Sequence, residues 1–273
     1  MSAPPPGVLT AFGADAEAVL LDGGMGETWR AGDLVLKPVG DRDAHAWVCD
    51  LFDGWGDRAV RVPAPVRTAR GDWSLDGWGA HVWLPGSTAR AGDDPDRFRE
   101  CVDAFHRAIA AVAPPTFLAG RTDAWAFGDR VAFDGVAPVG SPEVRALIAR
   151  AATALRPVRT APQLVHGDLG GNTLWADGLP PAVIDFSPYY RPSGWALAVV
   201  AMDAICWDGA APDLLDRWAD VDEWDQLLLR AVVFRLATRG RFEAEGAVRS
   251  GSDGYLDGRV GVDLVLDRIA RAA

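Results

Sequence analysis

Ionisable and amide side chains gather at the ends of two short apolar runs in the segment LVHGDLGGNTLWADGLPPAVIDF, residues 164–186. The first run ends in His166 and Asp168, Asn172 follows, and the second run ends in Asp185. Apolar strands can be buried while the loops at their ends stay accessible to a ligand. Two carboxylates and an amide at one edge suit a magnesium and phosphate site, because hard cations prefer oxygen ligands.

The string HGDLGGN followed by IDF resembles the catalytic and metal loops of the aminoglycoside phosphotransferase family, the small-molecule branch of the protein-kinase-like fold. In detail it is similar to an actinobacterial subgroup whose substrate is unassigned. The resemblance is specific over Gln163 to Pro192 and weak elsewhere, although the order of elements agrees along nearly the whole chain. It implies an α+β fold of two lobes: a small, antiparallel β-rich nucleotide lobe, residues 1–84, and a larger, mostly helical catalytic and substrate lobe, residues 85–273.

The resemblance also assigns roles. Asp168 is expected to orient the attacking hydroxyl and accept its proton, and Asp185 and Asn172 to hold magnesium at the phosphates of ATP or GTP. His166 is expected to hold the loop backbone. Taken singly, Asp168 also reads as a turn residue and His166 as a core histidine; the whole string in this order favours the kinase-like interpretation.

Two features depart from the family pattern. Only Leu169, Gly170 and Gly171 separate Asp168 from Asn172, one residue fewer than in kinases. A glycine with φ > 0 or in a tight turn would let the shorter loop still reach the metal. Many relatives carry an acid in the sequence DLA at the start of the next helix, where this chain has ALA, beginning at Ala196. That acid usually braces the catalytic loop.

A glycine cluster and one lysine point to phosphate binding in the first forty residues. Lys37 is the only lysine in the chain and lies in the apolar run LVLKPV. By the resemblance it pairs with the α- and β-phosphates; the alternative is a lysine reaching solvent from an edge strand. Backbone amides at small residues can approach phosphate closely, and the expected cover is formed by Gly23, Gly24 and Gly26.

The resemblance further predicts an acid on a helix that pairs with Lys37, and a hinge that binds adenine. Asp43 is the first candidate for the acid and Asp50 the second. The segment AHVWLPG alternates as a strand does and ends in glycine. The Val82 carbonyl and the Leu84 amide are the implied adenine contacts.

The elements that must position these side chains follow from periodicity. Residues 34–39 and 77–86 read as strands bounded by turn residues, and Asp177-Gly178 is a favoured pair for a hairpin turn. Pro95 and Pro142 lie at expected helix starts. Beyond Pro192 helices are expected at residues 195–207, near 213–219, at 221–238 and from about 262.

Composition excludes several classes of function. The net charge of −11 argues against nucleic acid as a partner, because phosphate backbones demand a basic face. Three widely spaced cysteines form neither a disulfide framework nor a metal knuckle. The N-terminus lacks the features of a signal peptide, and the longest apolar run is too short to span a bilayer. A soluble, cytoplasmic protein without a membrane partner is expected.

Three hypotheses for function remain. The first is a kinase that moves the γ-phosphate of ATP or GTP to a hydroxyl of a small molecule. Acidic residues outnumber basic ones between Asp203 and Asp225, which would attract a cationic aminoglycoside or amino-sugar if they are not merely a solvated face. The second is a catalytically impaired, nucleotide-binding pseudokinase, because of the short loop and Ala196. The third, a protein kinase, is disfavoured because no APE-type activation segment follows DFSPYY.

Overall fold

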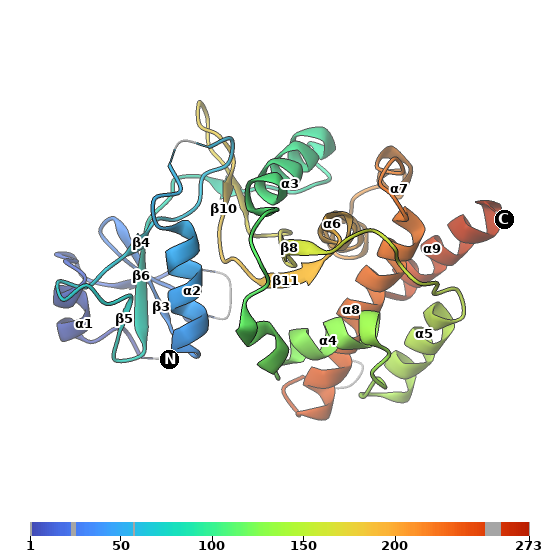
Figure 1. The fold of residues 1–273 in the computed structure, drawn as a ribbon, viewed down its shortest axis with the longest axis horizontal. Helices are drawn as coiled ribbons and strands as arrows, with labels where there is room; N and C mark the ends of the chain where they lie inside the picture. Colours follow the sequence, from blue (N-terminus) through green and yellow to red (C-terminus); the bar gives the residue numbers. More distant parts are fainter. Residues whose placement is uncertain (1, 23–25, 57, 249–257, 273) are drawn as a thin grey trace. The chain divides into compact units, whose positions relative to one another are not determined.

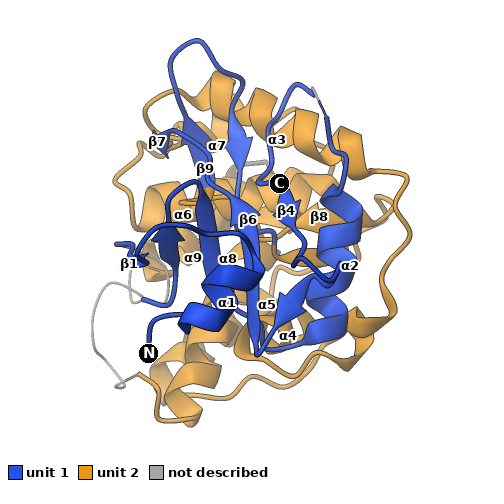
Figure 2. Ribbon diagram, turned by 90° about the vertical axis from the view of Figure 1, so that its left-hand side faces the viewer, with its two compact units in different colours: residues 1–88, 173–186 blue, residues 89–172, 187–273 orange. Residues whose placement is uncertain are grey.

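The structure is a computed structural model that describes residues 2–22, 26–56, 58–248 and 258–272. The chain forms two compact units, coloured separately in Figure 2. Unit 1 comprises Met1–Thr88 and Thr173–Phe186, and unit 2 comprises Ala89–Asn172 and Ser187–Ala273. This division differs from the expected boundary between residues 84 and 85, because a later hairpin joins the N-terminal part of the chain.

Backbone pairing explains why this hairpin belongs to unit 1. Strand β7 (Ser87–Thr88) pairs antiparallel with β9 (Thr173–Trp175), which pairs in turn with β10 (Ala182–Val183). Gly86 has a φ of 146°, and a Cβ at this position would lie 2.9 Å from the Trp175 carbonyl oxygen. Only glycine permits so close an approach of two backbones. The expected turn at Asp177-Gly178 joins β9 to β10, and Gly178 has a φ of 70°.

Unit 1 is built around an antiparallel sheet in the order β1-β2-β3-β6-β4, with β5 also paired to β6 (Figure 1). Apolar side chains of one face, among them Leu36, Trp78 and Ala80, form a core with Val8 from helix α1 and Phe12 directly after it. The elements are α1 (Pro6–Ala11), β1 (Val19–Leu20), β2 (Trp29–Ala31), β3 (Leu34–Pro38), α2 (Arg42–Phe52), β4 (Pro65–Val66), β5 (Ser74–Leu75) and β6 (Trp78–Val82).

Unit 2 is mainly helical and holds one strand pair. Strands β8 (Gln163–His166) and β11 (Pro188–Arg191) pair antiparallel, with His166 opposite Pro188. The sequence did not predict β11. The helices are α3 (Pro95–Ile109), the 3-10 helix η1 (Thr116–Gly120), α4 (Ala124–Asp134), α5 (Pro142–Ala152), α6 (Ser193–Cys206), α7 (Leu214–Arg217), α8 (Trp224–Ala244) and α9 (Gly258–Ala272).

Helix α8 is the centre of unit 2. It packs against α4, α5, α6 and α9, and most of its residues are buried (Figure 1). The helix starts that the sequence predicted carry side-chain caps: Asp94 accepts from the Arg97 amide at 3.1 Å and Ser141 from the Val144 amide at 3.3 Å. In the part of the chain that the structure describes, no helix combines the length and apolarity required to cross a membrane.

Candidate active-site groups

The only lysine of the chain forms an ion pair in unit 1. Lys37, on β3, places its Nζ 2.8 Å from Oδ1 of Asp185, which follows β10 in the sequence. Both side chains remain accessible, at 33% and 56% of their surface. Asp185 has a φ of 54°, a left-handed conformation that is uncommon outside glycine and occurs at functional sites. The ammonium group and this carboxylate are therefore together and open to a ligand.

The acids expected to pair with Lys37 lie elsewhere. Asp43 is exposed in the first turn of α2 and makes no ion pair among the described residues. Asp50 accepts a hydrogen bond from Trp73 Nε1 at 2.8 Å. The acids are elsewhere because the side chain that α2 presents to the sheet beside Lys37 is His45. The ring of His45 lies against Gly79, the residue opposite Lys37 in the β3–β6 ladder, where a Cβ would be 2.4 Å from the ring.

The expected phosphate cover and hinge are described in part. Gly23 and Gly24 lie outside the described residues; Gly26 is exposed and has a φ of 70°. At the hinge, the Val82 amide donates to the Ala64 carbonyl at 2.8 Å. The Leu84 amide makes no hydrogen bond within the described residues, which leaves it free to donate to a ligand.

In unit 2, residues 166–172 run from the last residue of β8 to the point where the chain leaves this unit, and we name them the 166–172 loop. Two histidines hold its backbone. Nδ1 of His166 accepts from the amides of Asp168, at 3.1 Å, and Ser187, at 3.4 Å. The His166 amide donates to Nε2 of His106, on α3, at 3.1 Å. Burial, and then the neighbouring His166, lowers the pKa of His106 to about 3, so that it stays a neutral acceptor.

Glycines give the 166–172 loop its shape. The Asn172 amide donates to the Leu169 carbonyl at 3.1 Å, which closes a β-turn, and Gly171, in its third position, has a φ of 79°. A Cβ at Gly167 would lie 2.3 Å from the ring of Tyr189, so that only glycine fits. The expectation that one of the two later glycines adopts φ > 0 is confirmed.

The side chain of Asp168 is held on both of its oxygens. Nδ2 of Asn172 donates to Oδ2 at 3.2 Å and to the Asp168 carbonyl at 2.7 Å. Nη2 of Arg235, on α8, donates to Oδ1 at 2.5 Å. Sequence reasoning missed Arg235, whose signal is a charged residue within the apolar run LLLRAVVFRLA. It also missed Asp203, on α6, which binds the same guanidinium.

Some of the acids between Asp203 and Asp225 pair with arginines that are distant in sequence. Arg99 from α3 binds Asp220 through two hydrogen bonds of 2.6 and 2.8 Å. Arg268 from α9 binds both Asp216 and Asp225. The excess of acids in the sequence is therefore not an equal excess of unpaired charge in the folded unit.

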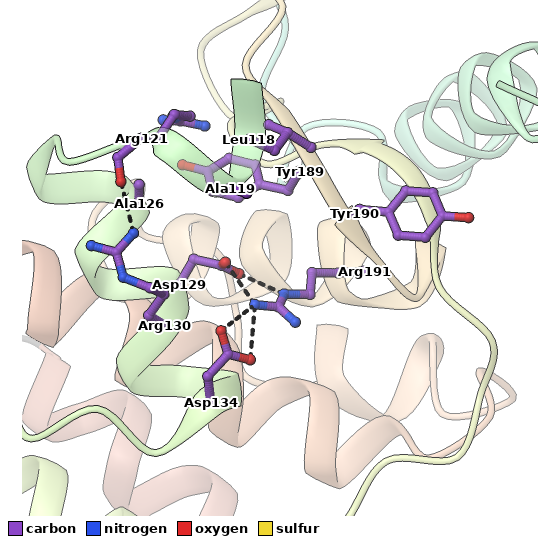
Figure 3. A pocket seen from close by; sticks show the side chains of 10 residues that line it. All are labelled: Leu118, Ala119, Arg121, Ala126, Asp129, Arg130, Asp134, Tyr189, Tyr190 and Arg191. Carbon is purple, nitrogen blue, oxygen red and sulfur yellow. Dashed lines mark hydrogen bonds and ion pairs between the residues drawn. The ribbon is translucent and has the colours of Figure 1, made fainter. Parts of the chain in front are cut away.

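A cavity of about 340 Å³ in unit 2 lies between α4, η1 and β11 (Figure 3). Three of its charged side chains, Arg191, Asp129 and Asp134, bind one another. Arg191 donates to both oxygens of Asp129 at 2.8 Å and to Asp134, as the dashed lines in Figure 3 show. Asp168 does not line this cavity. Tyr189 lines the cavity and also lies against Gly167 of the 166–172 loop.

The two groups of residues can perform complementary chemistry. The Lys37–Asp185 pair offers a cation for phosphate oxygens and a carboxylate for a hard cation. The 166–172 loop offers an oriented carboxylate that can accept a proton. Among the described residues no cluster of three or more histidine, cysteine or acidic side chains is arranged to hold a metal ion by itself.

Comparison with known proteins gives a consistent result at the level of the fold. No protein-family model matches the chain, and no curated protein matches it in sequence. A thermostable mutant of the aminoglycoside phosphotransferase APH(4)-Ia superposes with a TM-score of 0.60 at 15% identity, over 96% of this chain and 98% of the other. The choline kinase LicA from Streptococcus pneumoniae gives 0.64 at 10% identity, over 95% and 96%.

A third neighbour is the spectinomycin phosphotransferase APH(9)-Ia in complex with ADP and spectinomycin, with a TM-score of 0.56 at 12% identity over 95% of each chain. These likenesses extend over nearly the full length of all the chains. The chain therefore has the α+β, protein-kinase-like fold that these phosphotransferases and this choline kinase share.

Proposed function

We propose that this chain is a member of the aminoglycoside phosphotransferase family that moves the γ-phosphate of ATP or GTP to a hydroxyl of a small molecule. The observation that carries the proposal is the Lys37–Asp185 ion pair. The only lysine of the chain and the acid of the IDF motif are remote in sequence, yet they meet. The neighbours support it, since APH(4)-Ia has been crystallised with AMP-PNP and hygromycin B.

In the proposed reaction each unit has its own task. Lys37 binds phosphate oxygens of the nucleotide, and the Leu84 amide and the Val82 carbonyl bind the base. Asp168 orients the acceptor hydroxyl and takes its proton. The hydroxyl oxygen bonds to the γ-phosphorus while the bond to the bridging β–γ oxygen breaks, and the nucleoside diphosphate leaves.

The carboxylate of Asp185 and the amide oxygen of Asn172 are each of a type that suits magnesium. Asp185 is open to solvent and already faces a cation, Lys37. The Nδ2 of Asn172 is used within the loop, so its amide oxygen is the atom available to an ion. When bound, the ion neutralises charge on the transferred phosphoryl group.

The identity of the acceptor is a finer proposal. A cationic amino-sugar remains a candidate for the acceptor, because the family that the sequence resembles acts on such compounds. The arginine partners of Asp216, Asp220 and Asp225 lower the negative charge that would select a cation. We therefore include neutral sugars and amino acids beside aminoglycosides and choline in the panel of acceptors.

The test is nucleotide turnover across this panel with wild-type protein and Asp168→Asn. The substitution removes the proton acceptor but little volume, so we expect turnover to fall by about 10²–10⁴-fold with nucleotide affinity nearly unchanged. A variant that keeps more than about a tenth of wild-type turnover rules Asp168 out as the base.

A nucleotide-binding pseudokinase is the second candidate. The observation that favours it is the engagement of both Asp168 oxygens, by Arg235 and by Asn172. It predicts nucleotide binding without turnover on any acceptor of the panel. The same assay, combined with calorimetric titration of ATP and GTP, distinguishes the two candidates.

A further inference from the structure

The proposed base is connected to a buried acid through one guanidinium. Asp203 on α6 accepts from Nε of Arg235 at 2.9 Å through Oδ1 and from Nη2 through Oδ2. The same Nη2 donates to Oδ1 of Asp168 at 2.5 Å. Paired hydrogen bonds of this kind fix the plane of an arginine as well as its charge.

Burial increases from the 166–172 loop inward. The side chain of Asp168 is 39% exposed, that of Asp203 14% and that of Arg235 9%. Burial alone would lower the pKa of Arg235, but Asp203, and then Asp168, raise it above its ordinary value, so the guanidinium stays charged. A buried charge of this kind is strongly oriented by its partners, because breaking the pair costs several kcal/mol.

Helix geometry relates Asp203 to the acid missing at Ala196. Both residues lie on α6, two helical turns apart, and such positions share a helix face. A Cβ at Gly170 would lie 3.4 Å from Oδ2 of Asp203, which places this carboxylate beside the 166–172 loop. An acid from the expected helix therefore does reach the loop, two turns later than expected and with an arginine as intermediary.

We propose that Arg235, held by Asp203, is a positioning residue that fixes one oxygen of Asp168 so that the other faces the acceptor hydroxyl. This inference rests on the proposed function. Arg235 anchors Oδ1, and within the described residues Oδ2 accepts only the longer hydrogen bond from Asn172, which an acceptor hydroxyl can replace. The anchor acts on the orientation of the base and not on nucleotide binding.

The experiment replaces the buried pair by apolar residues of similar size, in the double variant Asp203→Leu/Arg235→Met. Such replacements of buried ion pairs often preserve the fold, whereas removal of one partner leaves an unpaired charge. The matched control is Asp129→Leu/Arg191→Met, which removes an ion pair of similar burial in the same unit. Melting temperature, kcat and KM for the nucleotide are measured for both.

We expect kcat of the first double variant to fall at least 10-fold, with KM for the nucleotide within about twofold of wild type. The control variant should keep kcat within about twofold. Arg235→Lys retains the charge but not the planar fork, and it should recover less than half of the lost kcat. A folded first variant with kcat near wild type would overturn the inference and leave only a structural ion pair.

A crystal structure of the first double variant tests the inference without turnover. We expect the Asp168 carboxylate to occupy more than one rotamer once its anchor is gone. If it keeps the wild-type orientation, Arg235 does not position it, whatever the activity. Absence of turnover in the wild-type protein would instead count against the proposed function, so the two failures are distinguishable.

Discussion

At the residue scale, the protein concentrates its chemistry in a few charged side chains whose partners are unusual for their types. A lone lysine meets an aspartate in a left-handed conformation, and a half-exposed aspartate is held by a buried arginine. Both arrangements orient a carboxylate while it stays accessible. Oriented, accessible charges of this kind are typical of catalytic and binding sites.

Loss of Lys37 should weaken nucleotide binding directly. In Lys37→Met a charge-assisted hydrogen bond to phosphate disappears, and we expect Kd for ATP to rise roughly 10- to 100-fold. Isothermal titration calorimetry measures this directly. Lys37→Arg keeps the charge and serves as the control, with a smaller loss. Equal affinity of Lys37→Met and wild type would contradict the role assigned to Lys37.

At the element scale, the 166–172 loop is positioned by the backbone geometry of its own glycines and by a buried histidine. Gly167 admits the ring of Tyr189, and the turn with Gly171 returns the chain so that Asn172 reaches Asp168. Nε2 of His106, on the neighbouring helix α3, accepts a hydrogen bond from the backbone amide of His166. The conformation of the loop therefore depends on φ at Gly171 and on the neutral state of the buried His106 ring.

Gly171→Val should damage the loop more than its exposure implies. A β-branched residue at φ > 0 is strained, at a cost of about 1–3 kcal/mol in the free energy of unfolding or in a rearranged loop. We expect turnover to fall at least 10-fold. Gly178→Val is the matched control, because Gly178 has a φ of 70° in the β9–β10 hairpin.

Urea unfolding and steady-state kinetics of both glycine variants give the comparison. The control should lose similar stability and keep its turnover. Equal turnover of Gly171→Val and wild type would show that the turn is not needed for activity.

His106 should make the stability of the protein depend on pH. Its folded pKa, about 3, is below the ordinary 6.5, so the unfolded chain takes up a proton first as the pH falls. The stabilisation is complete above pH 6.5 and is lost as the pH falls toward 3. Between pH 7 and pH 5 the loss is about 2 kcal/mol from this group.

His106→Gln tests this pH dependence, because the glutamine oxygen can accept the His166 amide and does not titrate. We expect the free energy of unfolding to fall about 2 kcal/mol less between pH 7 and pH 5 than in wild type. Chemical denaturation at both pH values measures it. Arg107→Gln, at an exposed neighbouring position, should follow the wild-type curve; a His106→Gln curve parallel to wild type would refute the assignment.

At the scale of the whole molecule, the chain divides its site residues between two units. Lys37 and Asp185 belong to unit 1, and Asp168, Asn172 and Arg235 belong to unit 2. The chain passes from one unit to the other directly after Asn172 and again after Phe186, so both of these connections lie beside proposed site residues. Ligand binding is therefore expected to affect the stability of the protein as a whole.

ATP with magnesium should raise the melting temperature. A ligand at about 100 times its Kd stabilises the folded state by about 2.7 kcal/mol, which corresponds to roughly 5 °C or more for a chain of this size. Removal of magnesium with EDTA should abolish most of this shift, because the triphosphate then lacks its counter-charge. Differential scanning fluorimetry with and without EDTA measures it. An equal shift under both conditions would exclude a magnesium-dependent nucleotide site.

The sequence by itself determined the kind of fold and supplied most of the candidate site residues. The string HGDLGGN with IDF, the single lysine and the helix periodicity are local signals, and they sufficed to predict an α+β kinase-like chain with Asp168 and Lys37. A φ > 0 or a tight turn at Gly170 or Gly171 was also expected from sequence, because only glycine readily adopts such a conformation in a shortened loop, and the structure places it at Gly171.

Only the tertiary structure decided which charges meet. Lys37 binds Asp185 and not Asp43, since α2 presents His45 to the sheet. Arg235 and Asp203 reach Asp168 from two helices that sequence reasoning had treated as packing and as an acidic rim. The hairpin at residues 173–186 joined unit 1 through β7, against the expected boundary. Pairing between remote residues depends on how helices and strands pack, and neither local propensity nor charge counting contains that information.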